Sequence, residues 1–130
     1  AWLEPTVRGL VPIEDLGRFA AAVRGNSIFP SDALQWAQAI FGDPLALSED
    51  ARKVLHATGP AFFDAVMQVY DESMDFSTLV AAAKKSTGAS GKNLFLPLRA
   101  ALTGHVHGPE MPAVYALLGP RARRRLELWA

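Results

Sequence analysis

The sequence predicts an all-α fold of about eight short helices in two packed sub-bundles. Apolar residues recur at a spacing of three or four through most of the 130 residues, and no stretch of strict alternation is long enough to indicate a strand. Glycine–proline pairs interrupt this pattern, as at Gly59–Pro60 and Gly119–Pro120, which indicates short connections between helices. Half of the residues are apolar and 20% are charged, a composition typical of a globular domain.

The first two helices are predicted over residues 13–23 and 31–41. Glu14 and Asp15 stand at the start of the first, where carboxylates interact favourably with the positive end of the helix dipole. Ser31 is predicted to cap the second, because a serine hydroxyl can accept a hydrogen bond from a free N–H group of the first turn. The apolar residues of the second helix share one face: Leu34, Ala37, Ile40 and Phe41.

The third and fourth helices are predicted on either side of Gly59 and Pro60. Ser48 is the predicted cap of the third. The fourth has apolar residues at i, i+3, i+4 and i+7, which is typical of a helix facing a core rather than of a cofactor site. These residues are Phe63, Val66, Met67 and Tyr70.

Four further helices are predicted beyond residue 73. The fifth begins at Asp75 or Ser77 and ends near Gly88. The sixth covers residues 92–103 and contains Pro97, where we expect the helix to kink or to begin afresh. The seventh covers residues 110–118, and the last carries the basic run of residues 121–125.

Charge is distributed unevenly along the chain. Residues 1–83 carry eleven acidic and five basic side chains, whereas residues 84–130 carry two acidic and eight basic ones. We therefore predict an acidic sub-bundle over residues 1–73 and a basic one over residues 74–130, with the acidic cluster Asp71, Glu72 and Asp75 at the boundary. A basic half attracts a polyanion such as an RNA backbone. The alternative reading is chance clustering on a solvated helix face.

Several kinds of chemistry lack residues to support them. The sequence has no cysteine, which excludes a disulfide scaffold, a thiolate zinc site and a cysteine nucleophile. It has no glycine-rich phosphate loop and no nucleophile elbow, and His105 and His107 have only Glu110 nearby as a metal ligand, so we expect neither a catalytic residue nor a metal site. No apolar run is long enough to span a membrane, and the chain begins at Ala1 rather than Met, so we expect a piece of a longer cytoplasmic protein.

Residues 92–108 gather basic and histidine side chains around helix ends bounded by glycine. Lys92 and Arg99 lie in the predicted helix, and Gly108 and Pro109 lie in the loop that follows it. Glycine lets the backbone approach a ligand closely, and the N–H groups at the start of the next helix favour an acceptor-rich partner. This pattern fits unpaired RNA, whose bases stack on side chains and form hydrogen bonds through their edges. The basic run of residues 121–125 either contacts phosphates or only makes the helix soluble.

The run from Gly91 to Glu127 resembles the C-terminal anticodon-binding region of bacterial-type glutamyl-tRNA synthetases, which are class I aminoacyl-tRNA synthetases. In that family a G-K-x-x-x-x-P-L-R-x-A-L-T-G segment precedes a loop with a G-P pair, a helix ending in L-L-G and a basic R-x-x-R-L helix. This sequence contains the first three of these segments in the same order, and its basic helix matches the fourth at Arg125 and Leu126. Residues 16–44 resemble the preceding helix, turn and helix more loosely, and residues 45–90 match only in helical character.

The resemblance implies a set of tRNA-binding residues. Arg99 and the loop residues Gly108, Pro109 and Met111 match positions that approach the first two anticodon bases, and Lys92 belongs to the same motif. The turn between the first two helices reads the third base, and Arg24 and Gly25 lie there. In the family an arginine at that turn selects glutamate tRNA. Gly25 in that position implies either a relaxed choice that extends to glutamine tRNA or a choice directed to glutamine tRNA.

The resemblance also implies partners and cofactors. We expect a monomer that binds the anticodon loop of glutamate or glutamine tRNA and that binds neither DNA nor a membrane. The family joins glutamate to tRNA with ATP and magnesium, but its H-I-G-H and K-M-S-K-S signatures are missing from this sequence, so we expect no cofactor and no activity in this chain alone. The alternative function is a helical protein-interaction module without RNA binding, which would hold a basic partner through Asp71, Glu72 and Asp75.

Overall fold

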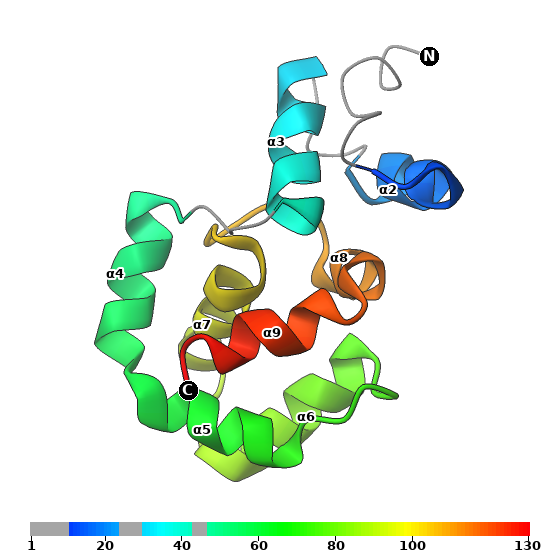
Figure 1. Cartoon of the computed structure of the whole chain (residues 1–130). Helices are drawn as coiled ribbons and strands as arrows, with labels where there is room; N and C mark the ends of the chain where they lie inside the picture. Colours follow the sequence, from blue (N-terminus) through cyan, green and yellow to red (C-terminus); the bar gives the residue numbers. More distant parts are fainter. Residues whose placement is uncertain (1–10, 24–29, 43–46) are drawn as a thin grey trace.

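The computed structural model describes residues 11–23, 30–42 and 47–130, and within these ranges it contains eight α-helices and no strand (Figure 1). The all-α prediction is thus confirmed. A short 3-10 helix, η1, covers Ile13–Asp15 and leads into the first α-helix. The α-helices are α2 (Leu16–Val23), α3 (Pro30–Phe41), α4 (Glu49–Thr58), α5 (Pro60–Val69), α6 (Phe76–Thr87), α7 (Lys92–Thr103), α8 (Met111–Leu118) and α9 (Arg121–Glu127).

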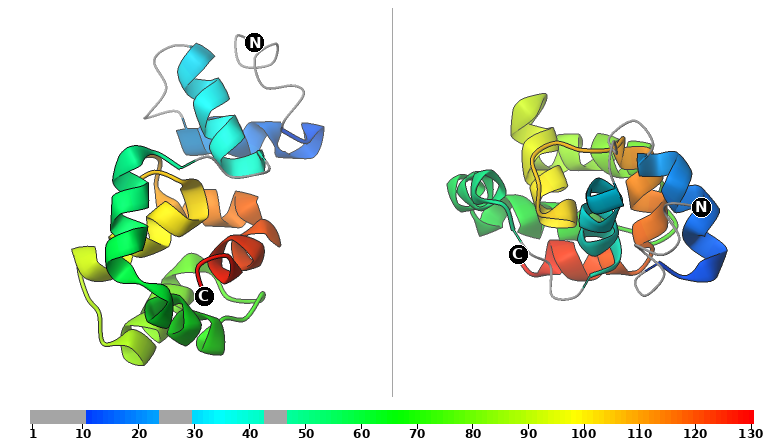
Figure 2. Two further views of the ribbon diagram at one scale, coloured as in Figure 1. Left: turned by 60° about the vertical axis from the view of Figure 1, so that its left-hand side comes forward. Right: turned by 90° about the horizontal axis from the view of Figure 1, so that it is seen from above.

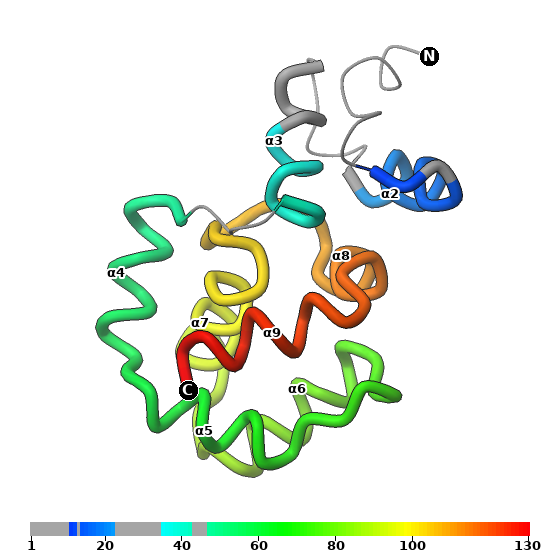
Figure 3. The backbone as a smooth tube through the Cα atoms, viewed as in Figure 1, coloured from blue at the N-terminus to red at the C-terminus, as the bar shows by residue number. Residues whose placement is uncertain are grey.

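The predicted cap Ser48 is confirmed by a hydrogen bond, and Asp75, one of the two predicted starts of the fifth helix, is the cap of α6. The hydroxyl of Ser48 accepts a bond of 3.1 Å from the N–H of Ala51 at the start of α4. The carboxylate of Asp75 accepts a bond of 2.8 Å from the N–H of Thr78 at the start of α6. Each satisfies a donor that the first helical turn would otherwise leave free. The backbone trace shows the sharp turn between α4 and α5 at Gly59 (Figure 3).

One local prediction is wrong, and one of the two alternatives in another is excluded. Helix α3 begins at Pro30, so Ser31 lies inside the helix and is not its cap. Proline suits the first helical position, because its missing N–H would have no partner there and its fixed φ angle is already helical. Helix α7 runs without interruption across Pro97, so it does not begin afresh at that residue. The Pro97 ring is buried, and its apolar contacts offset the missing backbone hydrogen bond.

The buried apolar residues form one core cluster to which every α-helix of the described ranges contributes. Helix α4 packs most closely on α7, and α5 packs on α6, while α9 contacts both α5 and α7. Helices α2 and α3 lie at one end of the molecule, where they contact α8 and α3 also contacts α7 (Figure 2). The division into sub-bundles at residue 73 stays a prediction. None of the helices in the described ranges is long and apolar enough to cross a membrane.

Candidate nucleic-acid interface

The Arg99 side chain lines a hollow of about 460 Å³ between α6, α7 and the start of α8. It is half-buried, and its Nη1 donates a hydrogen bond of 2.9 Å to the backbone carbonyl of Pro109. No carboxylate lies within ion-pairing distance of Arg99 in the described part of the chain. Burial lowers the pKa of the Arg99 guanidinium, but an arginine stays charged at neutral pH. Most of its N–H groups therefore remain open to a ligand.

The end of α7 fixes the direction of the loop that follows. Gly104 adopts the left-handed conformation, with φ at 78°, and its N–H bonds to the carbonyl of Ala100. The Thr103 hydroxyl bonds to the carbonyls of Arg99 and His105, at 2.9 and 3.2 Å, and the His105 N–H bonds back to that hydroxyl. The loop thus leaves α7 in one defined direction, toward α3.

Gly108 lies directly against the indole ring of Trp36 from α3. A Cβ atom at Gly108 would stand 2.6 Å from Cη2 of that ring, and the φ angle of 153° is one that other residues rarely adopt. The same ring meets His105 edge-on, with centroids 5.3 Å apart. Trp36 therefore holds the loop from two sides and sets the position of the buried Pro109, whose carbonyl in turn holds Arg99.

Some of the predicted tRNA-binding residues come together in the structure, and others do not. Arg99 and Met111 line the same hollow, and Pro109 is bonded to Arg99. Met111 is only 4% exposed, so it offers a ligand little surface. Lys92 is exposed at the first position of α7, two turns before Arg99. Arg24 and Gly25 lie outside the described residues. The role of all these residues in RNA binding stays a prediction.

Phe95 is not among the residues predicted from the sequence, yet its side chain lines the hollow beside Arg99 and is 46% exposed. Phe95 and Arg99 stand four residues apart on α7 and therefore share one face of the helix. The buried residues of α7 include Leu94, Pro97, Leu98 and Ala101, which mark the opposite face. The spacing of the apolar residues in α7 therefore places Phe95 outside the core. This spacing was the sequence signal that could have identified Phe95 as an exposed aromatic residue.

Both readings of the basic run are wrong for Arg125, which is 5% exposed and belongs to the core. Among the described residues, its guanidinium donates hydrogen bonds to four backbone carbonyls, those of Leu102 at the end of α7 and of Ala39, Ile40 and Gly42 at the end of α3. The last carbonyls of a helix have no partner within the helix and carry partial negative charge. Arg125 therefore caps two helices at once and joins α3 to α7.

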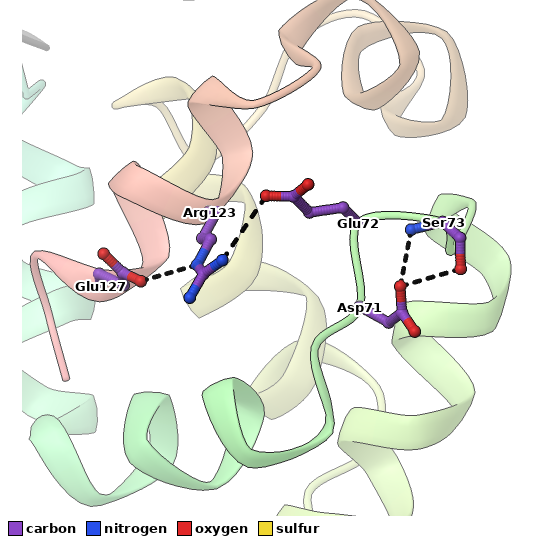
Figure 4. A network of polar contacts seen from close by, with 5 residues as sticks. All are labelled: Asp71, Glu72, Ser73, Arg123 and Glu127. Carbon is purple, nitrogen blue, oxygen red and sulfur yellow. Dashed lines mark hydrogen bonds and ion pairs between the residues drawn. The ribbon is translucent and has the colours of Figure 1, made fainter.

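The other arginines of α9 lie nearer the surface. The Arg121 guanidinium lies 5.0 Å from the centre of the Phe41 ring, a cation–π contact between α9 and α3. Arg123 pairs with Glu72 at 3.6 Å and with Glu127 at 2.9 Å (Figure 4). Arg124 is exposed.

The acidic cluster that would serve a basic protein partner is engaged within the chain. The Asp71 carboxylate accepts hydrogen bonds of 2.9 Å from the N–H and the hydroxyl of Ser73 (Figure 4). Asp75 caps α6, and Glu72 pairs with Arg123. These hydrogen bonds lower the pKa of Asp71 and of Asp75. The cluster is therefore explained by turn and helix geometry, which does not favour the protein-interaction alternative.

The two loop histidines differ in their surroundings. Burial, followed by the charge of His107, lowers the pKa of His105. No three metal-ligating side chains gather anywhere in the described ranges. His105 packs against Trp36, and His107 is exposed.

Comparisons with known proteins show the family to which the chain belongs. Residues 7–129 match the family described as "Anticodon binding domain". The chain is 44% identical over 127 residues to glutamate–tRNA ligase 1 of Methylococcus capsulatus, and 41% identical over 128 residues to glutamate–tRNA ligase 2 of Nitrosococcus oceani. The glutamate–tRNA ligase 2 of Alkalilimnicola ehrlichii is 44% identical over 128 residues. These alignments cover 96%, 97% and 97% of this chain but 27% of each relative.

Proposed function

Because the chain belongs to the anticodon binding domain family, we propose that it is the anticodon-recognition module of a glutamate–tRNA ligase. In this proposal it binds the anticodon loop of a glutamate or glutamine tRNA as a monomer in the cytoplasm. The joining of glutamate to tRNA with ATP and magnesium would be performed elsewhere in a longer protein, since the chain spans 27% of the length of its relatives. We expect no aminoacylation by this chain alone.

The observation that carries the proposal is the partial burial and incomplete hydrogen bonding of the Arg99 guanidinium. Its guanidinium is half-buried, is held by one carbonyl and has no carboxylate partner among the described residues. A cation that is partly removed from water and only partly bonded favours a ligand rich in hydrogen-bond acceptors. The edges of unpaired bases provide such acceptors, and arginine is a common reader of base edges.

A titration of the chain with RNA tests the proposal. A fluorescent stem-loop with the anticodon of a glutamate tRNA is compared with one in which the three anticodon bases are replaced, at two salt concentrations. We expect weak binding that prefers the natural anticodon and weakens with salt by a log–log slope of about −0.7 to −0.9 per phosphate contact. Absence of binding, or equal binding of both stem-loops, would contradict the proposal.

Substitution of Arg99 tests its role. Arg99→Ala should cost about 1–3 kcal/mol of binding free energy if the guanidinium reads a base edge. Arg99→Lys keeps the charge but loses the planar fork, so it should recover only part of the affinity. Arg52→Ala, at an exposed arginine of α4, is the matched control and should change affinity little. Thermal unfolding of each variant checks that the fold is intact.

We also propose that the turn containing Arg24 and Gly25 reads the third anticodon base. If Gly25 occupies the position of the selective arginine, the chain should bind stem-loops with glutamate and glutamine anticodons with similar affinity. Gly25→Arg should then favour the glutamate anticodon. An unchanged ratio of the two dissociation constants would contradict this assignment.

A further inference from the structure

One face of α7 carries a stripe of an exposed cation, an exposed aromatic ring and a half-buried second cation. Lys92, Phe95 and Arg99 stand at i, i+3 and i+7, so they lie above one another along the helix. Phe95 is 46% exposed, and its ring makes no aromatic contact within the described ranges. Lys92 has no ion pair there either. The stripe therefore presents a partly exposed ring between two positive charges that have no ion-pair partner among the described residues.

The hollow beside this stripe contains a donor and an acceptor that do not bond to one another. Arg99 and Glu110 both line it, yet they form no ion pair. Glu110 immediately precedes α8, and its side chain makes no capping hydrogen bond there. The floor is apolar and includes Phe76, Val80 and Met111. At about 460 Å³ the hollow falls within the size range of small-ligand sites.

These features favour one kind of occupant. A phosphate group would be repelled by the Glu110 carboxylate, and an apolar peptide side chain would leave both charged groups without partners. A nucleobase has a flat face that can stack on an aromatic ring, and its edge carries both hydrogen-bond donors and acceptors.

We propose that Phe95 is the stacking surface for one unpaired base of the bound RNA, with the base edge between Arg99 and Glu110 and a backbone phosphate at Lys92. The assignment rests on the proposed function and adds to it two residues, Phe95 and Glu110. Phe95 provides affinity independent of base identity, because every base has a face that can stack. Glu110 keeps phosphate out of the hollow and accepts a hydrogen bond from the base.

The test measures dissociation constants of the full chain and its variants for the fluorescent anticodon stem-loop across a range of salt concentrations. Phe95→Ala should weaken binding by about 5- to 150-fold without changing the salt slope, because stacking releases no counterions. Phe95→Trp should restore the affinity. Leu128→Ala, at the other large exposed apolar side chain of the described residues, is the matched control and should leave binding unchanged. Lys92→Ala should reduce the slope by about 0.7–0.9.

The sign of the change in binding affinity caused by Glu110→Ala distinguishes a base edge from a phosphate as the group that occupies the hollow. If a base edge lies between Arg99 and Glu110, the substitution weakens binding. If a phosphate lies there, removal of the carboxylate strengthens binding, and the assignment is overturned. Unchanged affinity of Phe95→Ala, while Arg99→Ala still weakens binding, would overturn the role of Phe95 and leave the proposed function standing. Failure of the unaltered chain to bind the stem-loop would instead overturn the proposed function.

Discussion

Replacement of Arg125 by alanine should destabilise the chain more than replacement of any other arginine of α9. The buried guanidinium forms hydrogen bonds of 2.5 Å to Ala39, 2.7 Å to Leu102, and 3.0 Å to each of Ile40 and Gly42. Without it, carbonyls at the ends of α3 and α7 lose their partner, and at 5% exposure water has little access to replace it.

The size of the loss follows from these four bonds. Hydrogen bonds to a charged group contribute about 1.5–3 kcal/mol each, so a simple sum would reach about 6–12 kcal/mol. Bonds made by one group are not additive, and water can enter beside the less buried Gly42. We therefore expect a loss of about 3–5 kcal/mol, comparable to removal of one partner from a buried ion pair. That is a large part of the 5–15 kcal/mol that stabilises a typical domain.

Urea unfolding followed by circular dichroism measures this loss. Arg125→Lys keeps the charge but directs fewer N–H groups toward the carbonyls, so it should fall between Arg125→Ala and the unaltered chain. Arg124→Ala, at the adjacent exposed position, is the control and should change the free energy of unfolding by less than about 0.5 kcal/mol. A loss below about 1 kcal/mol for Arg125→Ala would refute the view that this side chain joins the two helix ends.

Three further predictions concern the loop, a helix cap and pH. Gly108→Ala should lower the free energy of unfolding by about 1–3 kcal/mol, because the new Cβ meets the indole of Trp36. If that clash is the cause, the loss should be smaller in a Trp36→Leu background, and a double-mutant cycle of urea unfolding measures the difference. Ser48→Ala should cost about 1 kcal/mol in urea unfolding through loss of the cap of α4, whereas Ser48→Asp should cost little. The hydrogen bond from Thr78 lowers the pKa of Asp75 below its usual 3.8, so this stabilisation is present above that value and is lost as pH falls through the lowered one. Asp75→Asn, which keeps a capping side chain, should flatten that part of the pH profile, and an unchanged profile would contradict the assignment.

Much of the fold could be predicted because its signals are local. Residues within a few positions of each other determine the cap Ser48, the glycine ends of α4 and α6, and the full extent of α7. The same local signals left Asp75 and Ser77 as two possible starts of α6, of which Asp75 is its cap. The misreading of Ser31 has a local cause as well, since Pro30 competes with it for the start of α3. Local sequence patterns do not identify the first residue of a helix when two adjacent residues are both suited to a helix start.

The part played by Arg125 could not be predicted in the same way, because its partners lie 23 to 86 positions away. A run of arginines usually indicates a solvated face, and three of its four members lie at or near the surface. One signal was present, since Ala122, Arg125 and Leu126 share the spacing of a buried stripe. The spacing indicates that Arg125 faces inward. Only the folded structure shows that backbone carbonyls at the ends of α3 and α7 surround its guanidinium.

The indole of Trp36 gives the chain a built-in optical reporter. Its ring touches the backbone at Gly108 and the edge of His105, so its emission depends on where that loop sits and on the protonation of the imidazole. The same loop carries the carbonyl that steadies Arg99. If the tryptophans at positions 2 and 129 are replaced by phenylalanine, Trp36 is the only tryptophan left. Its intrinsic fluorescence would then report whether the loop moves on ligand binding, without an added label.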